Sequence, residues 1–187
     1  MAVKVNRRTP LYQGRVFLMV RENVTLDNGV NTDLDYIEHP GAAAIVPLIA
    51  PGEVLLIKQY RHALKQYIWE VPAGTLDPGE PVMGCARREL IEETGYAAEV
   101  WRKLGEITPV PGYSDERVHL FLAAELTAAR QELDADEVLA VHRMPLAQAL
   151  GMIPRGQIQD AKSICALFLA QQWLSHGEAD ASGGLTL

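Results

Sequence analysis

The helix expected over residues 81–94 constrains this chain more than any other feature, because its acidic residues fall on the apolar face. At about 100° per residue, Glu89 and Glu93 lie only about 40° apart. Glu93 then projects between Val82 and Ala86, on the side of the helix that should pack against the rest of the protein. The acidic face and the packing face of this helix therefore overlap.

A cluster of glutamates on a helix is most often a solvated surface, but that explanation places the carboxylates opposite the apolar stripe. Like charges four residues apart destabilise a helix, and inward carboxylates cost more unless they are paired or bound to a metal. All-oxygen ligands suit a hard cation such as Mg²⁺ or Mn²⁺. Arg88 lies four residues before Glu92 and can orient one carboxylate. The pattern therefore predicts a divalent-cation site on this helix.

The overall charge narrows the classes of partner that this chain can bind. Its 187 residues carry 17 basic and 24 acidic side chains, which gives a formal net charge of −7 at pH 7. This balance argues against binding to nucleic acid polymers or to an anionic membrane surface. Hydrophobic residues make up 48% and charged residues 22%, as is typical of soluble globular proteins. We therefore expect a small-molecule substrate, and neither a nucleic acid polymer nor a membrane as a partner.

Cysteine usage and hydropathy indicate the compartment. The two cysteines, Cys85 and Cys165, are too few for a disulfide framework and fit a reducing environment. The longest apolar run, residues 42–50, is far shorter than the roughly 20 residues of a membrane helix. The start of the chain is polar and basic, without the apolar run of a signal peptide. These features predict a cytoplasmic protein.

Strand patterns dominate the first half of the chain, and helices become frequent in the second half. We expect strands at residues 14–20, 34–38, 42–49, 53–59, 68–71, 99–106 and 118–125, and helices at 81–94, 145–152 and 158–174. For the helix over 81–94, Pro81 suits the first turn. The first two strands predict a small antiparallel N-terminal sheet. Strands and helices in this mixed order predict an α/β or α+β sandwich.

The same patterns divide the chain into three regions. Residues 1–40 form the N-terminal sheet, and residues 41–175 form the main domain. Residues 176–187 (HGEADASGGLTL) are small and polar, which is typical of a mobile tail.

The segment from Gly74 to Tyr96 resembles a known motif. Gly74, Glu80 and the run RELIEETGY over residues 88–96 match the Nudix box with no departure from its pattern. The resemblance to the Nudix hydrolase family implies an α/β/α sandwich around a mixed sheet. It also implies metal-dependent hydrolysis of a nucleoside diphosphate derivative.

By motif position, the resemblance assigns a role to each residue of the box. Glu89 and Glu93 would be the main metal ligands, Glu92 a further or water-mediated ligand, and Arg88 would hold the glutamates in place. Glu80 would orient the box or join the metal shell. The implied metal-ligating set is the carbonyl of Ala73 with Glu80, Glu89, Glu92 and Glu93.

Stretches outside the box resemble the ADP-ribose pyrophosphatases of this family. They are residues 59–61, 69–74, 108–116 and 160–162. Those enzymes carry a catalytic glutamate in the loop that corresponds to 108–116, which implies that Glu116 is catalytic together with Glu93 and Arg88. The implied substrate-binding residues are Arg61, Glu70, Gly74 and Pro111. From the residues alone, Glu116 can also be a solvated loop acid, Arg61 a surface strand residue, and Glu70 a structural partner.

The resemblance predicts hydrolysis of ADP-ribose to AMP and ribose 5-phosphate with Mg²⁺ or Mn²⁺. Within the same chemistry, the alternatives are GDP-mannose, another nucleotide sugar, or a dinucleotide such as NADH or FAD. A non-catalytic sensor of nucleotide sugars is a further alternative, although such proteins usually lack box glutamates. The resemblance also implies a homodimer formed through the N-terminal strands. Because the box region is itself acidic, an anionic diphosphate requires a metal ion there.

Overall fold

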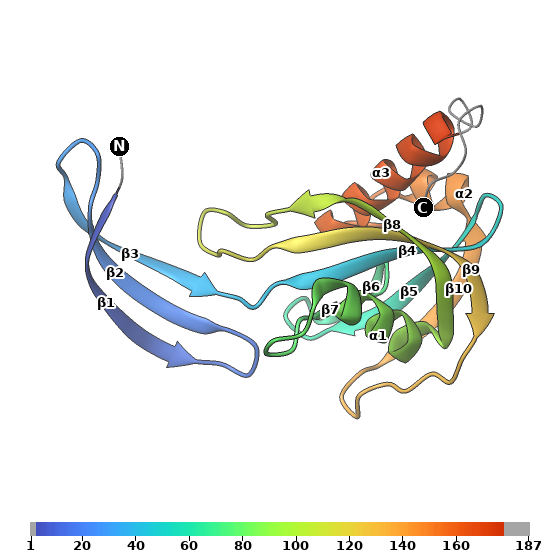
Figure 1. Cartoon of the computed structure of the whole chain (residues 1–187), viewed down its shortest axis with the longest axis horizontal. Coiled ribbons are helices and arrows are strands. Elements are labelled where there is room, and N and C mark those ends of the chain that lie inside the picture. The colour runs from blue at the N-terminus through green and yellow to red at the C-terminus, as the bar shows by residue number, and fades with distance from the viewer. Residues whose placement is uncertain (1–2, 178–187) are drawn as a thin grey trace. The chain divides into compact units, whose positions relative to one another are not determined.

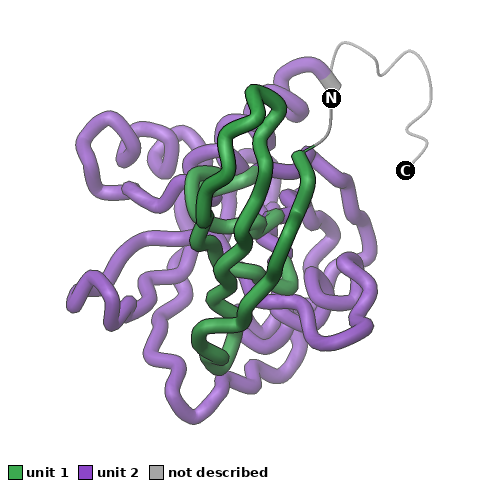
Figure 2. Tube along the Cα trace, turned by 90° about the vertical axis from the view of Figure 1, so that its left-hand side faces the viewer, with its two compact units in different colours: residues 1–41, 108–117 green, residues 42–107, 118–187 purple. Residues whose placement is uncertain are grey.

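The computed structural model describes residues 3–177. The expected tail, residues 176–187, therefore lies almost entirely outside the described residues. The chain forms two compact units, shown in different colours in Figure 2. Among the described residues, the N-terminal unit contains those up to 41 together with 108–117, and the main unit contains the others. The loop over 108–117 thus groups with the N-terminal unit, whereas the sequence interpretation placed it in the main domain.

The N-terminal unit is built on a 3-stranded antiparallel sheet with the order β1-β2-β3. Its strands are β1 (Lys4–Gln13), β2 (Leu18–Thr25) and β3 (Asn31–Glu38). The loop over residues 108–117 joins this unit because Ile37 exchanges backbone hydrogen bonds with it, donating to Tyr113 at 2.8 Å and accepting from Asp115 at 3.1 Å. The sequence prediction missed β1, whose described side chains are all exposed and lack the alternation that marks a half-buried strand.

The main unit contains a 7-stranded mixed sheet whose main path runs β10-β5-β4-β9-β8. Its strands are β4 (Ala42–Ala50), β5 (Glu53–Arg61), β6 (Gln66–Glu70), β7 (Ala73–Thr75), β8 (Tyr96–Ile107), β9 (Val118–Ala128) and β10 (Leu139–Pro145). Strand β4 pairs in parallel with β9, and the other pairings are antiparallel. The sequence prediction missed β10 and the short β7, and it began β8 three residues late.

Helices cover both faces of this sheet, as Figure 1 shows. They are α1 (Val82–Thr94), α2 (Leu146–Met152) and α3 (Ala161–Gly177). Successive residues of β4 point to opposite faces, so that Ala44 packs in a cluster with α2 and α3, whereas Ala43 and Ile45 pack with α1. The predicted α/β/α sandwich around a mixed sheet, with a small antiparallel sheet, is confirmed.

The ends of α1 follow from local geometry. Pro81 has φ −65° and ψ 139°, so it is the cap before the helix and not part of the first turn as expected. Gly95 ends the helix with φ 73°, a left-handed conformation in which glycine carries no Cβ penalty. Its N–H donates to the carbonyl of Ile91 at 2.8 Å. Within residues 3–177, no helix is long and apolar enough to cross a membrane.

Candidate active site

The inward carboxylates of α1 meet the short strand β7. Its Gly74 lies against Glu89 so closely that a Cβ atom at Gly74 would overlap all three atoms of the Glu89 carboxyl group. The neighbouring Ala73 donates its backbone N–H to the carboxylate of Glu93 at 2.8 Å. The backbone at Gly74 has no left-handed torsion, so the close approach of Glu89 is what a side chain at this position would disturb.

Glu89 and Glu93 are buried, with 7% and 1% of their surface exposed. Burial raises the pKa of Glu89 to about 7, although the charge and hydrogen bond of Arg88 act in the opposite direction. Burial also raises the pKa of Glu93 well above its usual range, opposed by the Ala73 amide. Within residues 3–177, no cation forms an ion pair with Glu93. The overlap of acidic and packing faces is thus a feature of the folded protein.

Arg88 connects three glutamates on the outer side of this cluster. Its Nε and Nη2 atoms donate to the two carboxylate oxygens of Glu80, each at 2.9 Å. Its Nη1 atom donates to Glu89 at 2.5 Å and to Glu92 at 3.0 Å, and Nη2 also reaches the carbonyl of Thr75 at 3.1 Å. The hydrogen bond from Arg88 lowers the pKa of Glu80. The predicted contact between Arg88 and Glu92 is present.

The carboxylate and carbonyl oxygens predicted as ligands are of the kind that a hard divalent cation binds. Their side chains are nevertheless not arranged around one common point. Among the described residues, no three His, Cys, Asp or Glu side chains are arranged to hold a metal ion. Glu80 and Glu92 are turned to Arg88, and Ala73 offers its N–H to Glu93. Burial nevertheless raises the pKa of both Glu89 and Glu93, even though Arg88 contacts Glu89, so additional positive charge beside these carboxylates would stabilise their ionised forms. A hard cation with oxygen ligands would supply that charge.

Arg61 and Glu70 form a second polar cluster, on the paired strands β5 and β6. The Arg61 Nε atom donates to Glu70 Oε2 at 2.8 Å, and Nη2 donates to Oε1 at 3.1 Å. Burial lowers the pKa of Arg61, but the hydrogen bonds and charge of Glu70 outweigh it, and the charge of Glu93 adds to the rise. Arg61 therefore lies within electrostatic reach of the carboxylates on α1.

Sequence reasoning missed one acid beside α1 and one base beside Glu70. Glu137, in the loop between β9 and β10, is close enough to raise the pKa values of both Glu89 and Glu93, after the larger effect of burial. Lys162, at the start of α3, donates to Glu70 at 2.5 Å. Glu137 has no local sequence signal apart from its charge. The stretch 160–162 matches the ADP-ribose pyrophosphatases, and this could have directed attention to Lys162.

The predicted residues Pro111 and Glu116 belong to the N-terminal unit and not to the unit that carries α1. The Glu116 backbone N–H donates to Ser114 Oγ at 3.2 Å, and its carboxylate lies 3.8 Å from Nδ1 of His39. Their roles in catalysis and substrate binding stay predictions.

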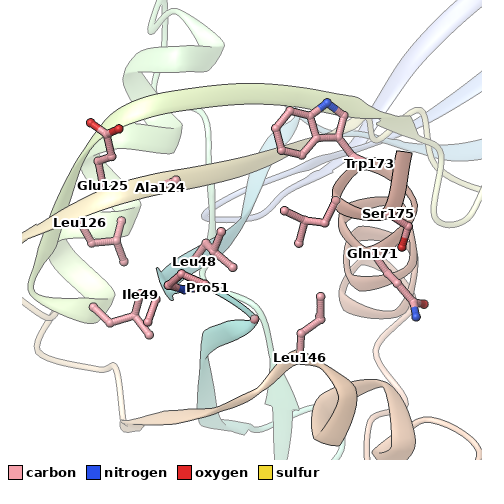
Figure 3. Close-up of a pocket in the computed structure, with 13 residues that line it drawn as sticks. Leu48, Ile49, Pro51, Ala124, Glu125, Leu126, Leu146, Gln171, Trp173 and Ser175 are labelled. Atoms are coloured by element: carbon pink, nitrogen blue, oxygen red, sulfur yellow. The ribbon is translucent and has the colours of Figure 1, made fainter. Parts of the chain in front are cut away.

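A cavity of about 890 Å³ lies elsewhere in the main unit (Figure 3). Its walls come from the β4–β5 turn, the end of β9, the start of α2 and the end of α3, and they include Leu48, Leu126, Leu146 and Trp173. No predicted site residue lines it. This cavity is therefore lined by residues other than the carboxylates of α1.

Comparisons with known proteins identify the family. The NUDIX domain model matches residues 38–167. An ADP-ribose pyrophosphatase of Bacillus subtilis (strain 168) is 37% identical over 166 residues, which is 88% of this chain and 90% of that protein. A GDP-mannose pyrophosphatase of Yersinia enterocolitica is 35% identical over 189 residues, with 91% of this chain and 97% of that protein covered.

A solved structure agrees with these sequence relatives. The crystal structure of an ADP compounds hydrolase superposes with a TM-score of 0.83 at 26% identity, and it covers 95% of this chain and 96% of that chain. The complete box motif, its inward carboxylates and these matches lead to one conclusion: the chain belongs to the NUDIX domain family and is a Nudix hydrolase.

Proposed function

We propose that this protein hydrolyses the pyrophosphate bond of ADP-ribose and releases AMP and ribose 5-phosphate. The observation that carries the proposal is the pair of buried carboxylates, Glu89 and Glu93, held against the loop at Ala73 and Gly74. The 37% identical ADP-ribose pyrophosphatase of Bacillus subtilis supports the choice of substrate.

In this proposal, Glu89, Glu93 and the Ala73 carbonyl hold the divalent cation, Mg²⁺ or Mn²⁺, and Glu92 and Glu80 complete its surroundings. When bound, such an ion neutralises the diphosphate, polarises a P–O bond and lowers the pKa of the attacking water. Arg88 orients these carboxylates and offsets their mutual repulsion, because it donates to Glu80, Glu89 and Glu92 at once. Gly74 leaves the space that the Glu89 carboxylate occupies.

The proton of the attacking water requires a carboxylate acceptor. The resemblance to ADP-ribose pyrophosphatases favours Glu116, together with Glu93. Glu137 is a second choice, because its charge already acts on Glu89 and Glu93. The variants Glu116→Gln and Glu137→Gln, assayed side by side, separate these assignments. The acceptor's variant loses kcat by at least about 100-fold, whereas the other retains most of it.

Arg61 is suited to bind the substrate's phosphate or ribose. Its bidentate contact with Glu70 occupies Nε and one hydrogen of Nη2, and its side chain is 39% exposed. A guanidinium carries five N–H donors, so the remaining donors can reach an anionic ligand. Gly74 and Pro111 complete the proposed substrate site.

GDP-mannose is the alternative substrate, because a GDP-mannose pyrophosphatase matches almost the whole chain. A panel of ADP-ribose, GDP-mannose, NADH and FAD with Mg²⁺ or Mn²⁺, followed by chromatography of the products, decides between them. ADP-ribose binding without AMP release would instead indicate a nucleotide-sugar sensor. Glu93→Gln is expected to lower kcat by orders of magnitude with the fold intact, and near-normal turnover would contradict the proposal.

We also propose that the protein is a cytoplasmic homodimer that forms through the N-terminal sheet. This sheet exposes apolar side chains, among them Val5, Leu11, Met19 and Leu34. Exposed apolar side chains of this kind can be buried against a second copy of the sheet. Light scattering that shows a monomer would refute the dimer. The two free cysteines, Cys85 and Cys165, are consistent with a reducing compartment.

A further inference from the structure

We propose that Lys162 is a positioning residue for substrate binding, which acts by fixing Glu70 and, through Glu70, the guanidinium of Arg61. The inference rests on the proposed function, in which Arg61 contacts the substrate. It adds a residue of α3 to a site that otherwise comes from α1 and the strands.

Only 2% of the Glu70 surface is exposed, so the ionised state of its carboxylate depends on hydrogen bonds and cations within the protein. Arg61 contacts both of its oxygens, and the Lys162 Nζ atom contacts Oε1 at 2.5 Å. Without Lys162, the buried carboxylate keeps Arg61 as its cation, but Oε1 loses its shortest contact and one of its two charged donors. The carboxylate can then rotate toward Arg61 or toward water. The orientation of the Glu70 carboxylate therefore depends on Lys162.

Lys162 is itself fixed by the first turn of α3. Its Nζ lies 3.1 Å from Asp160 Oδ2, and this oxygen also accepts the backbone N–H of Ser163 at 2.9 Å, in the manner of a helix cap. The Ser163 Oγ atom accepts the backbone N–H of Val71 at 2.8 Å. The start of α3 is thus tied to the residue that follows Glu70, so Lys162 approaches Glu70 from a rigid support.

The position of Arg61 is sensitive to this arrangement because other carboxylates attract it. The charges of Glu93 and Asp160 act on Arg61 in addition to that of Glu70. Two parallel hydrogen bonds to Glu70 fix the plane of the guanidinium and direct its free donors. When the Glu70 carboxylate rotates, one of those bonds is lost and Arg61 can move toward Glu93.

A double-mutant cycle with Lys162→Met and Arg61→Met tests the proposal. We expect Lys162→Met to raise KM about tenfold, the equivalent of one charge-assisted hydrogen bond, with kcat changed less than about threefold. In the Arg61→Met background, Lys162→Met should have no further effect on KM. The control is Lys58→Met, which removes an exposed lysine of β5 that lies over the Trp69 ring, and its KM should equal that of the wild type.

The conservative variant Lys162→Arg keeps the charge and should restore most of the lost affinity, provided that all variants unfold at similar temperatures. If Lys162→Met does not fold, the pair Lys162→Gln and Lys162→Arg gives the same comparison. An unchanged KM in the lysine variant, or independent losses that multiply in the double variant, would overturn the proposal. The cycle is run with the panel substrate that the wild type hydrolyses fastest. If the wild type does not hydrolyse ADP-ribose, the proposed function is wrong. The role of Lys162 is tested separately, by the KM values of the variants with the substrate that is hydrolysed.

Discussion

Replacing Gly74 by alanine isolates the contact on which the proposed metal site depends. The new methyl group would occupy the space of the Glu89 carboxyl group, whereas an ordinary contact between such atoms is about 3.5 Å. The carboxylate must therefore retreat by more than about 1 Å. A misplacement of this size in an active site can cost about 100-fold in activity. We expect kcat/KM of Gly74→Ala to fall by at least that factor.

The stability of the same variant should change little, because only the end of a flexible side chain moves. Burial raises the pKa of Glu89 to about 7 from its ordinary value of 4.5, which corresponds to roughly 3 kcal/mol of unfavourable interaction for the buried carboxylate. When the Glu89 carboxylate is displaced toward water, part of its desolvation penalty is relieved. This gain in stability offsets the loss from the weakened contact with Arg88. In EDTA, Gly74→Ala should unfold at or slightly above the temperature of the wild type.

Gly84 provides the matched control on the adjacent helix α1. A Cβ atom there has no neighbour closer than 3.6 Å, from Glu80 Cγ, so Gly84→Ala adds the same methyl group without a collision. Alanine in a helix is more favourable than glycine by about 1 kcal/mol, so this variant should be fully active and slightly more stable. The assays are product release with Mg²⁺ and thermal unfolding with EDTA. Activity of Gly74→Ala within threefold of the wild type would refute the role assigned to this contact.

Three further predictions follow from burial. In metal-free protein, the free energy of unfolding should fall as pH rises from about 4.5 to about 7, since folded Glu89 retains a proton that the unfolded chain releases; denaturant titrations should show a flatter dependence in Glu89→Gln. Burial raises the pKa of Cys85 to about 12, so iodoacetamide at pH 8 should leave this thiol unmodified in the native protein, as peptide mass analysis would show, whereas labelling of native Cys85 would contradict its burial. Leu90→Ala should destabilise the protein by about 2–5 kcal/mol in denaturant unfolding, because this side chain is fully buried in the cluster between α1 and the sheet; a loss below 1 kcal/mol would mean that the cluster is loosely packed.

The strands that sequence reasoning found and missed differ in one physical respect. Strand β4, with an apolar run buried on both faces, was predicted almost to the residue. The prediction missed β1, which is exposed along its length, and β10, which joins the sheet at its edge beside β5. Both strands are held in place by backbone hydrogen bonds to neighbouring strands. The pattern of apolar and polar side chains does not indicate such bonds.

By itself, the sequence determined the motif, the helix that carries it and the conflict between its acidic and apolar faces. These follow from local spacing, since residues four apart on a helix share a face wherever the helix lies. The contacts of Glu70 with Lys162, 92 residues away, and the approach of Glu137 to Glu89 and Glu93 were decided by the tertiary structure. Long-range pairings of charged groups depend on how the strands and helices pack, and no local pattern in the chain determines them.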